Sequence, residues 1–272
     1  MTRITGAASE HDFLLRRVAD DFAERLSAVR REFPLAACLG PTAEGLASRL
    51  AREPGIGNVT VALDDGGALP FEPESLDLVA SALTLQFVND LPGALAQIRR
   101  ALRPDGLMLA ALAGGETLKE LREAWLVAEA ETTGGASPRV APFADVRDCG
   151  ALLQRAGFAL PVADSDAVTV RYATPLALMR DVKGMGASNV LVERSRMPVT
   201  RALLLRACEV YAERYSDADG RVRATFEIIT LTGWAPHESQ QKPLAPGSAK
   251  SRLADALGVE ERPAGERAPK LK

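Results

Sequence analysis

The residues best suited to ligand chemistry follow two short apolar runs of this chain. Gly40 and Gly45 come after the run that ends at Leu39, and Asp64 and Asp65 come after the next β-branched run. Glycine lets a backbone approach a ligand closely because it carries no β-carbon, and a carboxylate accepts hydrogen bonds. These residues indicate a candidate ligand site. A strand-to-helix turn and a solvated acidic turn are the alternative interpretation.

Two further polar residues are candidates for catalysis or recognition. Gln86 stands where a predicted strand gives way to a loop, and an ordinary polar residue at a strand end is the alternative. His237 lies between Trp234 and Glu238 and the rest of a predicted loop. A lone histidine near an aromatic residue is usually structural, but a polar, aromatic loop suits recognition of a protein partner. The catalytic residues therefore stay unknown, with Gln86 and His237 as weak candidates.

Metal-ligating and nucleophilic residues are scarce. The chain has two histidines, His11 and His237, which argues against a histidine-rich metal site and against a Ser-His-Asp triad. Its three cysteines, Cys38, Cys149 and Cys208, are far apart, and none lies in a CxxC motif. We expect no metal site and three small, buried, apolar cysteines.

Composition is that of an ordinary globular protein. Of the 272 residues, 47% are hydrophobic and 25% are charged, which suffices for one sizeable core or two small ones. The net charge of -3 gives no electrostatic basis for binding nucleic acid. No apolar run approaches the roughly 20 residues that span a bilayer, and residues 1–10 lack the apolar core of a signal peptide. We therefore expect a cytoplasmic protein without a transmembrane segment.

Hydrophobic periodicity predicts strands that alternate with helices, which is typical of a mostly parallel sheet flanked by helices. Two alternating, β-branched segments in the second half predict antiparallel edge strands of the same sheet. We expect one domain over residues 12–240 and a C-terminal arm over 241–272 that is in part disordered, because its composition is rich in Pro, Lys, Ala and Glu. The predicted strands are 35–39, 59–63, 76–83, 107–112, 167–172 and 223–232, and the predicted helices include 12–32, 43–52, 116–131, 145–156, 176–185 and 199–215.

Several motifs resemble those of known families. The stretch from Leu69-Pro70-Phe71 through Ser75–Val79, Leu85–Pro92 and Leu102–Leu107 resembles the second half of a class I S-adenosylmethionine (SAM) methyltransferase, a group that includes the biotin-pathway malonyl-carrier methyltransferase. The second half of the chain resembles the bacterial relatives of mitochondrial complex I assembly factor five. The motifs that carry this second resemblance are Gly134-Gly135, Ser137-Pro138, Ala141-Pro142-Phe143, Arg155–Phe158, Gly184-Met185-Gly186, Ala224-Thr225-Phe226, Gly233-Trp234, His237–Gln240 and Gly247–Ala249.

The resemblance implies a class I SAM-methyltransferase fold and a SAM site at the carboxyl ends of the parallel strands. It implies that SAM would contact Leu39, Gly40, Gly45, Asp64, Asp65, Leu69 and Gln86. It also implies a protein partner, a subunit of respiratory complex I, because the mitochondrial member of that family is regarded as an arginine hydroxylase of such a subunit.

The cofactor loop departs from the pattern of the family. Cys38 stands where the family has a carboxylate for the ammonium group of SAM, and Thr42 and Glu44 replace two glycines, with Gly45 one step late. Only one strand is predicted between Gly45 and Leu69, so we expect a sheet one strand short. We expect weak or absent binding of SAM.

Three functions remain open from the sequence. The first is a SAM-dependent methyltransferase-like protein that modifies, or helps to assemble, a respiratory complex I subunit. The second is a pseudo-enzyme with a degenerate SAM site that acts as a protein-binding assembly module. The third is a methyltransferase of a small molecule or carrier protein, which the motifs of the second half disfavour.

Overall fold

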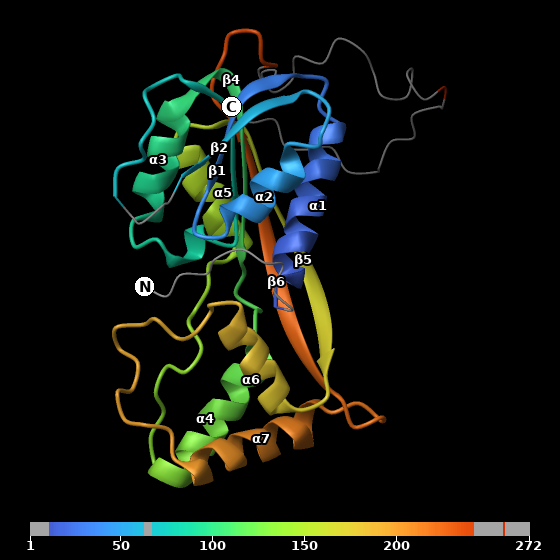
Figure 1. Cartoon of the computed structure of the whole chain (residues 1–272). Helices are drawn as coiled ribbons and strands as arrows, with labels where there is room; N and C mark the ends of the chain where they lie inside the picture. Colours follow the sequence, from blue (N-terminus) through green and yellow to red (C-terminus); the bar gives the residue numbers. More distant parts are fainter. Residues whose placement is uncertain (1–10, 63–66, 242–257, 259–272) are drawn as a thin grey trace. The chain divides into compact units, whose positions relative to one another are not determined.

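The computed structural model describes residues 11–62, 67–241 and 258 (Figure 1). The chain divides into two units, Met1–His237 and Glu238–Lys272, and all helices and strands of the described residues belong to the first. Most of the predicted arm 241–272 lies outside the described residues, as do Asp64 and Asp65.

A six-stranded sheet forms the centre of the first unit. Its order is β2-β1-β3-β4-β6-β5; β2, β1, β3 and β4 are parallel, and β6 is antiparallel to both of its neighbours. A mixed, mostly parallel α/β sheet is therefore confirmed. Of the residues between Gly45 and Leu69, those that the structure describes form a single strand, β2, at the edge of the sheet. The strands are β1 (Phe33–Leu39), β2 (Ile56–Ala62), β3 (Leu76–Ala82), β4 (Leu102–Ala113), β5 (Ala159–Tyr172) and β6 (Val222–Trp234).

Helices cover both faces of this sheet. An apolar stripe on α1, including Val18 and Phe22, packs with α2 on one face, and Leu95 and Ile98 of α3 pack with α5 on the other. Each such large side chain contributes about 1.5–3 kcal/mol when it is fully buried. The helices are α1 (Phe13–Ser27), α2 (Ala43–Leu50), α3 (Leu91–Ala101), α4 (Lys119–Thr133), α5 (Val146–Arg155), α6 (Pro175–Gly184) and α7 (Arg201–Tyr215), with a short 3-10 helix at Leu85–Phe87.

Strand β5 is longer than its sequence pattern predicts. The periodicity indicates 167–172, but pairing with β6 begins at Ala159. The added segment carries Asp164 and Asp166, which strand propensity disfavours. Both form ion pairs with arginines of α1, at 2.7 Å to Arg25 and 2.7 Å to Arg17, so tertiary contacts override the local preference.

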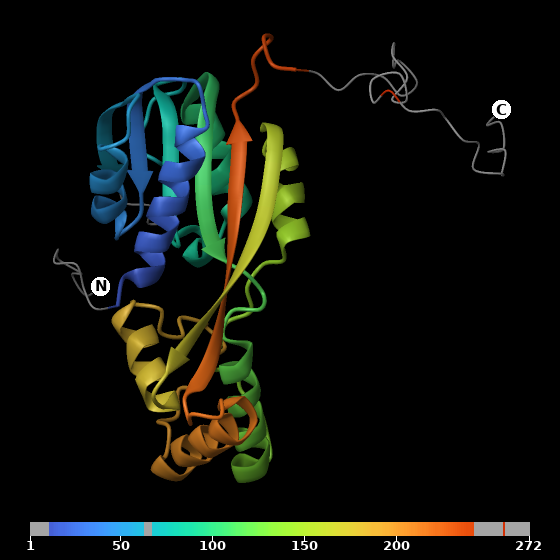
Figure 2. The same cartoon turned by 90° about the vertical axis from the view of Figure 1, so that its right-hand side faces the viewer.

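Strands β5 and β6 extend beyond the parallel strands into a second group of helices, α4, α6 and α7, which we call the helical layer (Figure 2). Strand β4 ends at Ala113, opposite Ile228, whereas β6 begins six residues earlier at Val222. The turn before α4 covers the edge of β6 that β4 leaves open, because Leu118 N–H donates to the Thr225 carbonyl at 2.7 Å. The carboxyl ends of the parallel strands point toward this layer (Figures 1 and 2).

Candidate functional site at the carboxyl edge of the sheet

The turn from β1 into α2 is built around Gly40. Its φ of +118° is one that side-chain-bearing residues rarely adopt, and its N–H donates to the Ala62 carbonyl of β2 at 2.9 Å. A β-carbon on Gly40 would lie 2.2 Å from Thr84 Oγ1. Glycine is therefore required here by backbone conformation and by space.

The loop after β3 brings Thr84 to this turn. Leu83 has a φ of +51°, and Thr84 is buried with its hydroxyl donating to the Ala82 carbonyl at 3.1 Å. The carboxyl ends of β1 and β3 are adjacent. The chain continues from β1 to β2 on one side and from β3 to β4 on the other, so the strand order reverses between β1 and β3, which is the switch point where α/β folds bind ligands. The structure thus places Leu39, Gly40 and the β3 loop at one edge of the sheet.

Two buried polar atoms at this edge have no hydrogen-bond partner among the described residues: Ser81 Oγ and Gln86 Oε1. Ser81 pairs with Leu39 of β1 and with Ala110 of β4. Gln86 uses its amide N–H to donate to the Leu83 carbonyl at 2.8 Å. A buried acceptor without a partner is unfavourable, so this edge suits a bound polar group. Ser81 was not predicted, because a serine inside an apolar strand gives no distinctive signal.

Gly45 does not belong to the turn. It lies inside α2 and is exposed, and no atom lies within 4 Å of the β-carbon position. The N-cap residue of α2, Thr42, makes no side-chain capping hydrogen bond, and Glu44 is exposed in the first helical turn. Gly45 therefore serves no close backbone approach within the described residues, and the steric case against Glu44 is weaker than the sequence suggests.

Cys38 carries no charge to this edge. The side chain is fully buried in the core between the sheet and helices α1 and α2. Burial raises the pKa of its thiol to about 12, so the thiol is neutral at physiological pH. The end of β1 therefore provides no anionic partner for a ligand cation.

The two remaining predicted residues, Leu69 and His237, lie in different parts of the fold. Leu69 reaches α3, where its N–H donates to Gln97 Oε1 at 2.8 Å. His237 follows β6, whose last residue Trp234 pairs with Leu107 at the amino-terminal part of β4. Because β6 is antiparallel, this is the edge of the sheet opposite Gly40. The structure therefore separates His237 from Gln86, and the two do not form one site.

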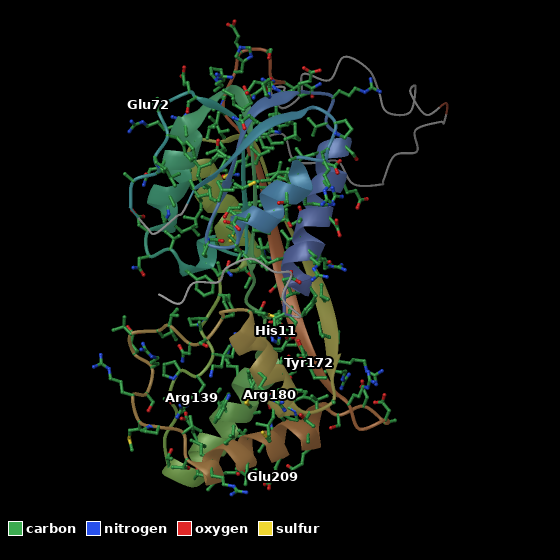
Figure 3. All side chains as sticks on the ribbon, viewed as in Figure 1. His11, Glu72, Arg139, Tyr172, Arg180 and Glu209 are labelled. Atoms are coloured by element: carbon green, nitrogen blue, oxygen red, sulfur yellow. The ribbon has the colours of Figure 1, made fainter. Side chains whose placement is uncertain are left out.

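A histidine that sequence analysis left without a role lies on the side of the helical layer. His11 precedes α1, and its Nδ1 lies 2.6 Å from Asp181 Oδ1 of α6 (Figure 3). The Tyr172 hydroxyl donates to Asp181 Oδ2 at 2.6 Å. The sequence gives no signal for this cluster, because its members are far apart along the chain and meet only through the fold.

The loop after α4 is held by a buried ion pair. Arg139 lies 2.6 Å from Glu129, its guanidinium also lies 5.4 Å from the centre of the Trp125 ring, and Ser137 donates to the same carboxylate. Desolvation raises the pKa of Glu129, but hydrogen bonds from Ser137 and Arg139 outweigh it and hold that pKa below its usual value. The Arg139 side chain is 15% exposed, and its role is structural.

Two general features of the described residues bear on the kind of site. They contain no group of three or more histidine, cysteine, aspartate or glutamate residues arranged to hold a metal ion. No helix among them is long and apolar enough to cross a membrane.

Comparison with known proteins agrees with this geometry. Residues 29–110 match the family model of a methyltransferase domain. Over 267 residues the chain is 39% identical to the mitochondrial arginine-hydroxylase NDUFAF5 of Danio rerio, with 91% of this chain and 83% of that protein covered. It is 35% identical over 272 residues to the malonyl-[acyl-carrier protein] O-methyltransferase of Halorhodospira halophila, with 92% and 89% covered.

A solved structure shows the same fold. A candidate methyltransferase from Bacillus halodurans C-125 superposes with a TM-score of 0.53 at 14% identity, and the match covers 80% of this chain and 98% of that one. At this identity the similarity concerns the fold alone.

Proposed function

Because this chain belongs to the methyltransferase-domain family of the arginine-hydroxylase NDUFAF5, we propose that it acts on an arginine of a protein, a subunit of respiratory complex I. The observation that carries the proposal is the 39% identity over 91% of the chain. This similarity extends past residues 29–110, which match the methyltransferase family model, into the helical layer. A cytoplasmic location is part of this proposal.

The described residues fit SAM poorly. Ser81 Oγ and Gln86 Oε1 offer unpaired polar atoms, and Gly40 gives a sharp turn. The ammonium of SAM, however, needs an anionic partner, and the residue in that place, Cys38, is a buried neutral thiol. Thr84 also fills the space next to Gly40. We propose that binding of SAM is weak or lost.

The activity is tested in cells that lack this gene. Peptide mass spectrometry of the complex I subunits should reveal an arginine that carries one added oxygen atom in wild-type cells and lacks it in the deletion strain. Re-expression of the full chain should restore the oxygen. Unchanged arginines together with normal assembly of complex I in the deletion strain would contradict the proposal.

The cofactor is tested by calorimetric titration of the purified full chain with SAM and with its demethylated product. We expect no low-micromolar binding of either compound. The Gly45→Ala variant is the control: if Gly45 lies against a cofactor, the added methyl group weakens binding. Low-micromolar affinity that this variant lowers would show that the site is intact, and methyl transfer would then become the leading function.

One alternative keeps support from the same geometry. A chain with a degenerate SAM site can act as an assembly module that binds a complex I subunit without modifying it. Capture of a complex I subunit on the full chain, together with unchanged arginines in the deletion strain, would favour this alternative over modification.

A further inference from the structure

Three elements hold the imidazole of His11 in one orientation. His11 precedes α1, Asp181 belongs to α6 and Tyr172 ends β5. The carboxylate of Asp181 accepts hydrogen bonds at 2.6 Å from His11 Nδ1 through one oxygen and at 2.6 Å from the Tyr172 hydroxyl through the other. The Asp181 side chain is 16% exposed, whereas that of His11 is 38% exposed. The imidazole is therefore oriented from one side and open on another.

Gly184 fixes the plane of this ring. A β-carbon on Gly184 would lie 2.3 Å from His11 Cδ2, so the imidazole lies directly against the backbone at the end of α6. This contact accounts for one glycine of the Gly184-Met185-Gly186 motif. Any larger residue there would displace the ring.

The hydrogen bonds also fix the role of each ring nitrogen. An ionised carboxylate only accepts hydrogen bonds, so Asp181 assigns the proton to Nδ1. In the neutral imidazole Nε2 is then an acceptor, and no described residue donates a hydrogen bond to it. Desolvation and the hydrogen bond to Asp181 raise the pKa of Tyr172, which keeps its hydroxyl a donor. In this neutral form the cluster presents one acceptor nitrogen backed by a carboxylate.

The location of this acceptor fits a substrate. The carboxyl ends of the parallel strands point toward the helical layer, and His11 lies on that side, where α1 meets α6 (Figures 1 and 3). Guanidinium is a planar cation with five N–H donors and no acceptor. An acceptor nitrogen with a negative charge behind it is complementary to such a group.

We propose that His11 Nε2 receives an N–H of the substrate guanidinium, and that Asp181 and Tyr172 position the imidazole for this contact. The inference rests on the proposed function, because it names the place where the target arginine binds. It assigns His11 to substrate binding and assigns no redox step to it. A purely structural tie between the segment before α1 and helix α6 is the competing explanation.

The chain offers a direct test because its only other histidine is His237. In the full-length His237→Gln variant, the side-chain resonances of one imidazole remain, those of His11. Titration with N-acetyl-arginine amide should shift these resonances in a saturable way. N-acetyl-citrulline amide, which is neutral and similar in shape, should bind at least tenfold more weakly. Equal shifts with both compounds, or no saturable shift, would overturn the inference.

Variants separate binding from structure. In a background that retains both histidines, His11→Ala should weaken binding of N-acetyl-arginine amide at least tenfold, measured by calorimetry, while His237→Gln leaves it unchanged. Tyr172→Phe removes one hydrogen bond to Asp181 and should weaken binding two- to fivefold. A His11→Ala protein with unchanged affinity would refute the inference, and its thermal midpoint shows whether it remains folded.

The inference and the proposed function fail in different ways. If re-expression of the His11→Ala protein restores arginine modification fully in the deletion strain, the substrate arginine binds elsewhere and the proposed function stands. If the deletion strain shows unchanged arginines, the proposed function fails whatever His11 binds.

Discussion

The side chain of Thr84 occupies the space against Gly40, so that a β-carbon on Gly40 would lie 2.2 Å from Thr84 Oγ1. The two residues belong to loops that follow adjacent strands, β1 and β3. The contact therefore locks together the two loops that form the candidate site. It also means that the sharp turn at Gly40 serves packing within the chain, and not only the approach of a ligand.

Gly40→Ala should destabilise the protein by about 2–4 kcal/mol, because alanine is strained at a φ of +118° and its methyl group collides with Thr84. Urea unfolding followed by circular dichroism measures the change. Gly45→Ala is the matched control. It lies in an exposed helical position with open space, so we expect stabilisation by about 0.5–1 kcal/mol. Equal effects of the two substitutions would contradict this account of Gly40.

The three thiols should differ in reactivity. Burial raises the pKa of Cys38 to about 12 and that of Cys149 to about 11, and both side chains are fully buried. Cys208 is only half-buried. Because the thiolate is the nucleophile, a disulfide reagent at pH 8 should modify Cys208 alone in the native protein and all three cysteines in urea. Rapid native modification of Cys38 would show that the core under α1 and α2 opens.

The buried thiols of Cys38 and Cys149 should make the stability of the fold decrease at alkaline pH. Their pKa values are higher in the folded protein than in the unfolded chain, where a thiol ionises near pH 8.5. Between that pH and about 11, the unfolded state holds fewer protons, so stability falls as pH rises, by up to about 1.4 kcal/mol per pH unit for each thiol. The urea midpoint at pH 7, 9 and 10 measures this. The Cys149→Ala variant should show a shallower decline.

Arg139→Ala should destabilise the protein by about 3–5 kcal/mol, since it leaves the buried carboxylate of Glu129 without its cationic partner. Arg139→Lys keeps the charge but loses the planar guanidinium and its stacking on Trp125, so it should lower the free energy of unfolding less than Arg139→Ala does. The exposed Arg171→Ala is a control of the same residue type.

The Glu129 pair also gives a test by pH. The pKa of Glu129 is lowered in the folded state, so this stabilisation is present above the unfolded pKa near 4.3 and is lost as pH falls through the folded value. The difference in stability between wild type and Arg139→Ala should therefore shrink below about pH 4. A difference that stays constant from pH 7 to pH 3 would show that the pair contributes packing and no charge interaction.

Hydrophobic periodicity predicted the sheet and most helices, because apolar spacing follows directly from which face of an element is buried. Asp90 caps α3, and its side chain accepts a hydrogen bond from Gly93 N–H at 2.9 Å. The start of β5 was not predictable, because Asp164 is placed in a strand by Arg25 of a distant helix. Local propensity carries no information about such a partner.

The candidate site was predicted in part. Alternation of strands and helices implies a parallel sheet whose strands end at one edge, so Gly40 and the β3 loop could be expected at the same edge. The distance of His237 from that edge was not, because it depends on the antiparallel direction of β6. Gly45 and Gly40 were both expected to contact the cofactor, although Gly45 lies in a helix and Gly40 in a turn with positive φ.

Strands β5 and β6 run without interruption from the central sheet into the helical layer. No loop between these two strands can act as a joint between His11 and Gly40. Any movement of the helical layer relative to the central sheet has to bend or twist this two-stranded ribbon, which resists deformation along its whole length. Such movement is then elastic and graded, and it is not a rotation about a hinge.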